Sequence, residues 1–272
     1  MLVLARLNYS DTMSYMPKPF AALDVDGTIF KSSLAEKVVD ACIDAKVFAA
    51  EPFNLVFANK RRWQTNNNEG VYQAYLHRLV RTFISQMAGI EVERFDRVIA
   101  TMISEHSVRK FAFPRRLINS LQTSHHIVAI SGSPDILVRP FLADLPVQTA
   151  FGSAFAVEDG IFTGAARAVG DKAAILQGLV AANVASQAGS VAVGDTFSDA
   201  PMLAYAETAI MFNASRTLTK YGQEFGWLRV NEVKDQQSVL EYNIDRELYE
   251  EKAVDVLLDR LRIAGTDEQS HS

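Results

Sequence analysis

The sequence predicts an α/β fold, in which helices cover both faces of a parallel sheet and a helical domain is inserted after the first strand. Three observations predict it. Helix and strand patterns alternate from about residue 111 to 214, which is typical of a parallel sheet. No alternating strand pattern is found from about 34 to 110. A chain of 272 residues, 49% hydrophobic, can bury one core and a smaller satellite domain.

The first half of the chain begins with a short strand and continues as helices. Residues 20–23 are apolar, and Gly27 ends the strand. Ser33 and Glu36 form a capping box, which predicts the start of a helix. Apolar residues at helical spacing then predict three helices, over 34–48, 69–90 and 91–111.

The second half alternates between helices and strands. Residues 147–164 are punctuated by glycine and predict a hairpin that turns at Glu158-Asp159-Gly160. A further helix is predicted near 238–265, before a polar end. The other predicted strands are 126–131, 190–194 and 208–213, and the other predicted helices are 114–123, one from Pro134, 171–183 and 199–206.

These elements predict the division into domains. The parts are an N-terminal extension (1–16), an α/β core (17–33 and 111–230), a helical cap (34–110), and a C-terminal helix with a tail (231–272). Ligands bind at the carboxyl ends of parallel strands, and the insert leaves the core there. We therefore expect it to cover the site, with hinges near 31–33 and 111–114.

The composition excludes several classes of protein. A net charge of −5 and a pI near 5.6 argue against a general nucleic-acid binder. Cys42 is the only cysteine, so neither an internal disulfide nor a cysteine-based zinc site can form, as is usual in a reducing cytoplasm. No apolar run approaches the roughly 20 residues of a membrane span. We expect a cytoplasmic protein that binds neither nucleic acid nor membranes, of unknown oligomeric state.

Two aspartates follow the first strand directly, in the stretch FAALDVDGTIF. At the end of a buried strand, Asp24 and Asp26 repel each other unless a positive group lies between them. A metal ion meets that need. An ordinary turn at a strand end also accounts for this stretch taken alone.

The next strand ends in Ser131-Gly132-Ser133-Pro134. Ser133 can cap a helix that begins at Pro134, and amide groups and a hydroxyl there would bind an anion. Lys172 opens a later helix, where the helix dipole disfavours a cation unless an anion is near. A plain capped helix and a solvated surface lysine are the respective alternatives.

The stretch GDTFSD, 194–199, follows another buried strand. Asp195 and Asp199 lie four residues apart on a strand-to-helix turn, so both can face one point, and hard oxygen ligands at such a point suit Mg²⁺. Asp199 is alternatively a helix cap. All four clusters lie at strand ends or helix starts, which favours a single shared site.

With these motifs, the sequence resembles the haloacid dehalogenase-like hydrolase superfamily. The resemblance rests on DVDGT (24–28), Ser131 in ISGS, Lys172 in GDK and GDTFSD, and covers roughly 18–33 and 111–214. The position of the insert, with ISGSP and SDAPML, is most similar to the phosphoserine phosphatase-like branch. That branch implies a Rossmann-like core with a helical cap of the C1 type.

The resemblance implies phosphoryl transfer through an aspartyl phosphate. Asp24 would attack phosphorus, and Asp26 would protonate the leaving oxygen and then activate water. Mg²⁺ would be bound by Asp24, the main-chain carbonyl of Asp26, Asp195 and Asp199. Because Asp26 is present, dehalogenation is disfavoured.

Four further groups would contact the phosphate or its nucleophile. Ser131, the amide of Gly132 and Lys172 would bind the transferring oxygens. Thr28 would orient Asp24 or contact the phosphate. The resulting prediction is a Mg²⁺-dependent phosphatase that acts on a small phosphomonoester.

The substrate is less constrained than the chemistry. Phosphoserine-specific enzymes of this branch tend to have GDG and Asn-Asp where this chain has GDTFSD, so phosphoserine is one candidate beside amino-alcohol and other small phosphates. The basic stretch 59–70 is usually a solvated helix face; alternatively, Arg62 or Arg78 closes over an anionic substrate. A phosphotransferase and a non-catalytic regulatory or scaffold protein stay open as other functions.

Overall fold

The computed structural model describes residues 17–66, 69–233, 236–243 and 248–267. The predicted N-terminal extension, 1–16, and the last residues of the polar tail, 268–272, lie outside the described residues.

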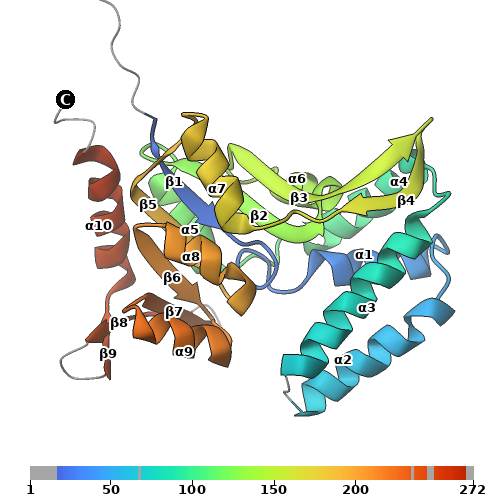
Figure 1. Cartoon of the computed structure of the whole chain (residues 1–272), viewed down its shortest axis with the longest axis horizontal. Coiled ribbons are helices and arrows are strands. Elements are labelled where there is room, and N and C mark those ends of the chain that lie inside the picture. The colour runs from blue at the N-terminus through green and yellow to red at the C-terminus, as the bar shows by residue number, and fades with distance from the viewer. Residues whose placement is uncertain (1–16, 67–68, 234–235, 244–247, 268–272) are drawn as a thin grey trace, which may run out of the picture.

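The described residues form one nine-stranded sheet in the order β4-β3-β2-β1-β5-β6-β7-β8-β9 (Figure 1). Neighbours from β3 to β7 in this order are parallel, whereas β4, β8 and β9 pair antiparallel. The parallel sheet of the predicted α/β fold is thereby confirmed. The strands are β1 (Pro19–Leu23), β2 (His126–Pro134), β3 (Thr149–Glu158), β4 (Ile161–Arg167), β5 (Ser186–Gly194), β6 (Thr208–Phe212), β7 (Leu228–Val233), β8 (Gln236–Asn243) and β9 (Leu248–Lys252).

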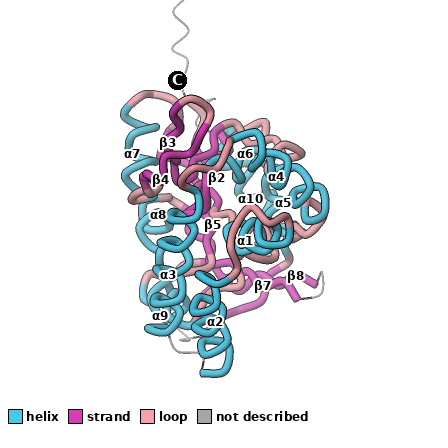
Figure 2. The backbone as a smooth tube through the Cα atoms, turned by 90° about the vertical axis from the view of Figure 1, so that its right-hand side faces the viewer, coloured by secondary structure: helices cyan, strands magenta, loops and turns pink. Residues whose placement is uncertain are grey.

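Helices lie on both faces of the sheet (Figure 2). After the insert these are α5 (Ala112–Leu121), α6 (Asp135–Phe141), α7 (Lys172–Ala181), the 3₁₀ helix η2 (Phe197–Asp199), α8 (Ala200–Tyr205), α9 (Arg216–Glu224) and α10 (Val254–Asp267). Among the described residues, no helix combines the length and the apolar character needed to cross a membrane.

The central strand β1 shows why both faces are covered. Its side chains alternate, and every one is buried. Ala21 and Leu23 belong to a core that includes residues of α5, α6 and α10. Phe20 and Ala22 belong to a second core with residues of α7, α8 and α9. A strand that is apolar on both sides requires this two-sided arrangement.

A helical insert separates β1 from β2, as the sequence predicts. It comprises α1 (Leu34–Asp44), the 3₁₀ helix η1 (Glu51–Phe53), α2 (Asn54–Asn66), α3 (Glu69–Met87) and α4 (Val92–His106). The first helix ends earlier than predicted, since Lys46 adopts a positive φ of 54°. α2 was not predicted, because its sequence is largely polar; it lies alongside α3 (Figure 1).

The insert contacts the sheet region in two places. At its two connections, the amide of Lys31 donates to Arg109 and the amide of Phe111 donates to Ile29, each at 2.9 Å. At its far side, the α3–α4 turn pairs with β4, where Gly89 donates to the carbonyl of Phe162 at 2.8 Å.

Aromatic packing reinforces the second contact. Phe83 of α3 and Phe95 of α4 lie edge-on to Phe155 and Phe162 of the β3–β4 hairpin, each with ring centroids 5.5 Å apart. The hairpin itself is as predicted, with its turn at Asp159 and Gly160, both at positive φ. The insert is thus docked on the hairpin as well as tethered by its connections.

The predicted helix over 238–265 is wrong in its first half. Residues 236–243 and 248–252 form β8 and β9, and only α10, from Val254, is helical. The unpredicted strand β7 presents an edge to which β8 adds, so pairing with the sheet overrides the local helical spacing. β7 also carries Glu232, whose carboxylate accepts from the first amides of α5, those of Ala112 and Phe113.

Candidate active site

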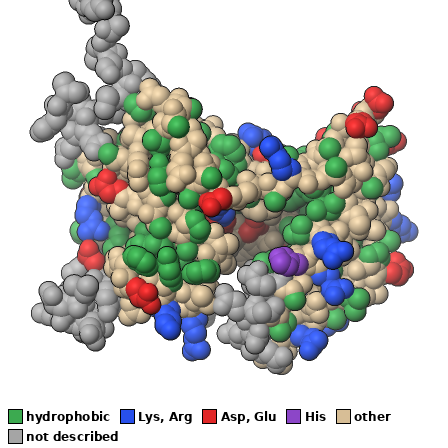
Figure 3. Space-filling view, in the orientation of Figure 1, with side chains coloured by type: hydrophobic (Ala, Val, Ile, Leu, Met, Phe, Trp, Pro, Cys, Tyr) green, Lys and Arg blue, Asp and Glu red, His purple; other side chains and the backbone are tan. Residues whose placement is uncertain are grey.

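The four sequence clusters meet at one edge of the sheet. Three of them lie at the carboxyl ends of β1, β2 and β5, which are neighbours in the sheet, and Lys172 is the first residue of α7. Figure 3 shows a hollow in the surface between this edge and the helical insert, with basic side chains on the side of the insert.

Asp24 comes directly after β1 and is only 6% exposed. Its Oδ1 accepts a hydrogen bond from the ammonium of Lys172 at 2.5 Å, whereas its buried Oδ2 has no hydrogen-bond partner. Burial raises the pKa of Asp24 to about 7 against the opposing effect of Lys172, and Asp199 and Asp26 raise it further. An ionised Asp24 therefore has one oxygen that is free to act.

Lys172 links two of the acids. Its ammonium donates to Asp24 at 2.5 Å and to Asp199 at 2.6 Å, and the residue is 8% exposed. Burial alone would lower the pKa of Lys172, but the carboxylates of Asp199 and Asp24 outweigh burial and raise it above its ordinary value. The lysine is therefore a permanent cation at the start of α7.

Asp195 and Asp199 are placed by the turn after β5. Oδ2 of Asp199 accepts from the amides of Asp195 at 3.1 Å and Thr196 at 3.0 Å, which closes a capping box at η2. The hydroxyl of Thr28 donates to Asp195 at 3.3 Å. Burial, followed by Asp24 and Asp199, raises the pKa of Asp195 well above its ordinary value.

Two glycines allow these acids to approach the backbone. Gly27, at φ +87°, lies so close to the carboxylate of Asp195 that any side chain there would collide with it. Gly194 faces Asp199 in the same way. Glycine is therefore required at both positions for the carboxylates to converge.

The converging carboxylates fit a divalent cation. Asp24, Asp195 and Asp199 each offer an oxygen, and these oxygens lie within 4.8 Å of one another. Among the residues that the structure describes, only one ammonium, that of Lys172, is within hydrogen-bond distance of this acidic group. The excess negative charge, the partnerless Oδ2 of Asp24 and the all-oxygen donor set together match Mg²⁺.

Asp26 has very different surroundings. Its Oδ1 accepts from the amide of Leu34, at the start of α1, at 2.5 Å. Its Oδ2 accepts from the hydroxyls of Ser131 at 2.6 Å and Ser133 at 2.8 Å. Burial raises the pKa of Asp26, while these three neutral donors act in the opposite direction. Both oxygens are fully satisfied, and their partners carry no charge.

Ser133 differs from its prediction. The sequence predicts that it caps the helix after β2, but α6 begins at Asp135 after Pro134, without a side-chain cap. β2 instead extends to Pro134, and this places the hydroxyl of Ser133 on Asp26. If the strand had been predicted to continue to Pro134, alternation of its side chains would have placed Ser131 and Ser133 on one face. The Ser-Pro pair instead favoured the prediction of a helix start.

Thr28 and Gly132, which were also predicted to contact the phosphate or its nucleophile, have the following neighbours. Thr28 contacts Asp195 and not Asp24, because the turn at Gly27 directs it toward the strand end of β5. Gly132 is exposed, and its carbonyl accepts from Ser153 of β3 at 2.8 Å.

The two arginines predicted to contact substrate lie on the insert. Arg62 is on α2 and Arg78 on α3, both exposed, and neither makes a hydrogen bond or ion pair with the motif residues that the structure describes. Within the insert, Lys60 of α2 donates to Glu36 of α1 at 2.6 Å. Tyr75 of α3 donates to the other oxygen of Glu36.

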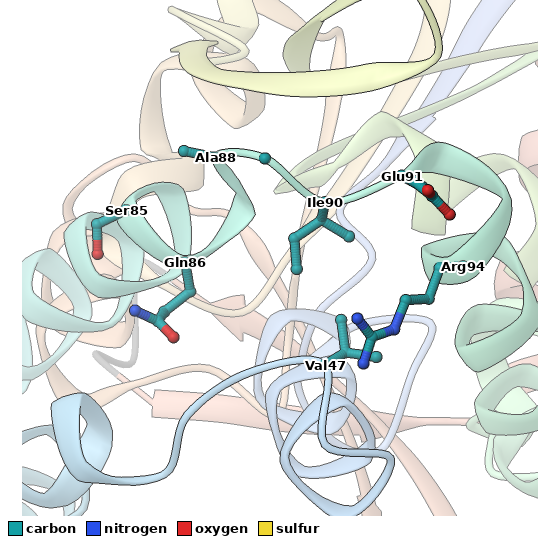
Figure 4. A pocket seen from close by; sticks show the side chains of 8 residues that line it. Val47, Ser85, Gln86, Ala88, Ile90, Glu91 and Arg94 are labelled. Carbon is teal, nitrogen blue, oxygen red and sulfur yellow. The ribbon is translucent and has the colours of Figure 1, made fainter.

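A cavity within the insert is separate from this site. It has a volume of about 410 Å³ and lies between the segment after α1, the end of α3 and the start of α4 (Figure 4). Its polar side chains already hold the backbone after α1, since Gln86 accepts from Ala49 at 3.1 Å and Arg94 donates to Lys46 at 2.8 Å. No motif residue lines it.

Comparison with solved structures shows which proteins share this fold. A phosphoserine phosphatase described as a phospho-aspartyl intermediate analogue is 20% identical (TM-score 0.52, covering 75% of this chain and 90% of that one). A probable phosphoserine phosphatase from Vibrio cholerae is 17% identical (TM-score 0.55, 94% and 69%). A protein of unknown function from Bordetella pertussis Tohama I is 14% identical (TM-score 0.64, 78% and 98%). At these identities the likeness establishes the fold.

The family follows from the sequence itself. No curated protein matches the chain significantly. The model of the haloacid dehalogenase-like hydrolases matches residues 21–204, which is more than half of the chain and includes all four clusters. This match confirms the resemblance that those clusters predicted. The chain belongs to the haloacid dehalogenase-like hydrolase family.

Proposed function

We propose that this protein is a Mg²⁺-dependent phosphatase that hydrolyses a small phosphomonoester through an aspartyl phosphate. The observation that carries the proposal is the contrast between the two neighbouring aspartates. Asp24 has a buried carboxylate oxygen without a partner among excess negative charge. Asp26, two residues away, is held by neutral donors only. The first arrangement suits a nucleophile and the second a proton carrier.

The reaction has two steps. In the first, a carboxylate oxygen of Asp24 forms a bond to phosphorus while the bond to the ester oxygen breaks, and a protonated Asp26 gives its proton to that oxygen. In the second, Asp26, now a carboxylate, takes a proton from water as the water attacks phosphorus. The bond to Asp24 breaks, inorganic phosphate leaves and Asp26 is protonated again.

The remaining motif residues would stabilise the charge on the phosphoryl group. Lys172, Ser131 and the amide of Gly132 are proposed to bind its oxygens, with Thr28 positioning Asp195. Asp24, Asp195, Asp199 and the main-chain carbonyl of Asp26 would hold Mg²⁺. When bound, the ion supplies a positive charge that offsets repulsion between the carboxylates and the phosphate.

The helical insert is proposed to act as a cap over the site and to select the substrate. Support comes from its place beside the hollow in Figure 3 and from its tethers next to the Asp26 loop. Arg62 and Arg78 are proposed to contact the ester from the cap. The phosphoserine phosphatases of similar fold make amino-acid phosphates the first candidates, with amino-alcohol, sugar and polyol phosphates beside them.

The test is phosphate release from a panel of these esters, with and without Mg²⁺. We expect Mg²⁺-dependent release that Asp24→Asn abolishes. Release to an added alcohol in preference to water would instead indicate a phosphotransferase. If wild type releases no more phosphate than Asp24→Asn with any ester, the phosphatase is refuted, and stable Mg²⁺ or phosphate binding would then favour a regulatory or scaffold role.

A further inference from the structure

We infer that Ser133 is a positioning residue for Asp26: its hydroxyl holds the carboxyl group in place while Ser131 turns to the phosphate. This inference rests on the proposed function. The sequence predicted only a helix-capping role for Ser133, and its contact with Asp26 is an observation of the structure.

Two hydroxyls share one oxygen of Asp26. Ser131 donates to Oδ2 at 2.6 Å and Ser133 donates to the same atom at 2.8 Å. Both serines are buried, with exposures of 0% and 5%. The amide of Ser133 also donates to the hydroxyl oxygen of Ser131 at 2.9 Å. The two hydroxyls therefore lie close together on Asp26, and the hydroxyl of Ser131 has an additional contact with the backbone of Ser133.

The frame around Ser133 comes from β3. Pro134 pairs with Ser153, and the hydroxyl of Ser153 donates to the carbonyl of Gly132 at 2.8 Å. The strand passes so close that a Cβ on Gly152 would lie 2.8 Å from the carbonyl oxygen of Ser133. Because β3 fixes this segment, Ser133 keeps its position when Ser131 changes partner.

Asp26 needs a second partner during the reaction. If Ser131 binds a phosphoryl oxygen, it no longer donates to Asp26, and Oδ2 keeps Ser133 alone. A hydroxyl donates to a carboxylate and accepts from a carboxylic acid. Ser133 can therefore remain bonded to Asp26 before and after proton transfer. Without it, the carboxyl group is held on one side only, by the amide of Leu34.

This role predicts that the effect of Ser133→Ala on kcat/KM depends on the acidity of the leaving group. Esters of weakly acidic alcohols need the proton from Asp26, whereas esters of acidic phenols leave without it. We would measure kcat/KM, which reports the first step, for substituted phenyl phosphates whose phenols differ in acidity. Ser133→Ala should lower kcat/KM roughly tenfold or more for the least acidic phenol and by less than about twofold for the most acidic.

Matched variants separate positioning from general damage. Ser133→Thr keeps a hydroxyl and should restore the wild-type dependence. Ser153→Ala removes a hydroxyl that holds the same segment but does not contact Asp26, and it should change kcat/KM by the same factor for all esters. If Ser133→Ala melts below the assay temperature, Ser133→Cys, a much weaker donor of similar size, takes its place.

The outcomes are distinct. The inference is supported if kcat/KM depends more steeply on the acidity of the phenol in Ser133→Ala than in wild type, and if Ser133→Thr restores the wild-type dependence. A uniform loss across the series, or no loss, overturns the positioning role while leaving the phosphatase intact. Absence of hydrolysis by wild type above the Asp24→Asn background overturns the proposed function, and the role of Ser133 with it.

Discussion

The carboxyl ends and the amino ends of the parallel strands, called here the carboxyl edge and the amino edge of the sheet, bury polar side chains in opposite ways. At the carboxyl edge, Asp24 is buried with one oxygen unpartnered and further carboxylates beside it. Before the amino end of β2, His125 is 1% exposed and both ring nitrogens have partners, the hydroxyl of Ser124 at 2.9 Å and the carbonyl of Gly189 at 3.1 Å. Gly265 of α10 lies against the ring.

The difference shows that burial alone does not mark a functional site. A carbonyl only accepts, so Nε2 of His125 donates to Gly189 and Nδ1 accepts from Ser124, and the neutral ring is fully satisfied. Asp24 has unmet bonding capacity and excess like charge, which a folded protein tolerates where a ligand supplies what is missing. The amino edge is satisfied within the fold, whereas the carboxyl edge is the one proposed to bind a ligand.

The largest expected effects set the two edges directly against each other. Asp24→Asn should reduce kcat/KM on the order of 10³-fold or more, because it removes the proposed nucleophile. It should also raise the melting temperature of the metal-free protein at pH 8. Burial raises the pKa of Asp24 from 3.8 to about 7, so folding free energy is lost as pH rises between these values; at pH 8 the full cost is present, and Asn removes it.

His125→Gln should do the reverse. We expect a lower melting temperature, because the ring's packing and hydrogen bonds are lost, with kcat/KM within about twofold of wild type. Thermal melts and steady-state kinetics on both variants test the contrast. A stable His125→Gln combined with a destabilised Asp24→Asn would refute it.

Lys172→Met should have the next largest effect, on stability. It leaves Asp24 and Asp199 buried without their cation, and breaking a buried pair costs about 3–5 kcal/mol in the free energy of unfolding. Lys110→Met is the matched control, since Lys110 is also buried but its partner Asp144 is largely exposed and stays solvated. Urea titrations without metal should show the larger loss for Lys172→Met; equal losses would contradict the excess charge at the carboxyl edge.

Mg²⁺ should stabilise the carboxyl edge more modestly. At a hundredfold excess over its Kd, a ligand adds about 2.7 kcal/mol of stability, which corresponds to a rise of about 5 °C in melting temperature for a chain of this size. Asp195→Asn should abolish most of that rise, whereas Asp144→Asn, an ion-paired acid elsewhere, should keep it. A rise that survives Asp195→Asn would place the ion outside this site.

Much of the site could be predicted from sequence, because its parts are local motifs at strand ends. Asp24, Asp26 and Asp195 each follow an apolar run, and parallel strands bring their carboxyl ends together. Lys172 could be predicted from its unfavourable place in a first helical turn. The partnership of Lys172 with Asp199 could not, since it depends on how α7 packs against η2.

The predictions from sequence that were wrong or missing have a common physical cause: each of these segments depends on a partner that is distant in the sequence. β8 is a strand because β7 offers an edge, and α2 is a helix because α3 lies beside it; neither neighbour is encoded in the segment's own spacing. Ser133 likewise contacts Asp26, 107 positions away in sequence. Its Ser-Pro pair satisfied a helix-start rule, and only the extension of β2 overrules it.

The smallest expected effect is a pH dependence at the amino edge. Burial lowers the pKa of His125, with Lys18 adding to the shift and the bond to Gly189 opposing it. In the unfolded chain the ring titrates near its ordinary value of about 6.5. As pH falls below that value, the unfolded state gains a proton that the folded state does not, so this group's stabilisation, present above pH 6.5, is progressively lost.

His125→Gln has no titrating ring at this position, so the stability difference between wild type and variant should shrink as pH falls from 7 to 5.5. The limit is about 1.4 kcal/mol per pH unit for one group. The difference isolates His125 from the acids of the carboxyl edge, whose raised pKa values favour the folded state as pH falls. A difference constant over this range would mean that the ring gains a proton as readily in the fold as in the unfolded chain, and burial would then not lower its pKa.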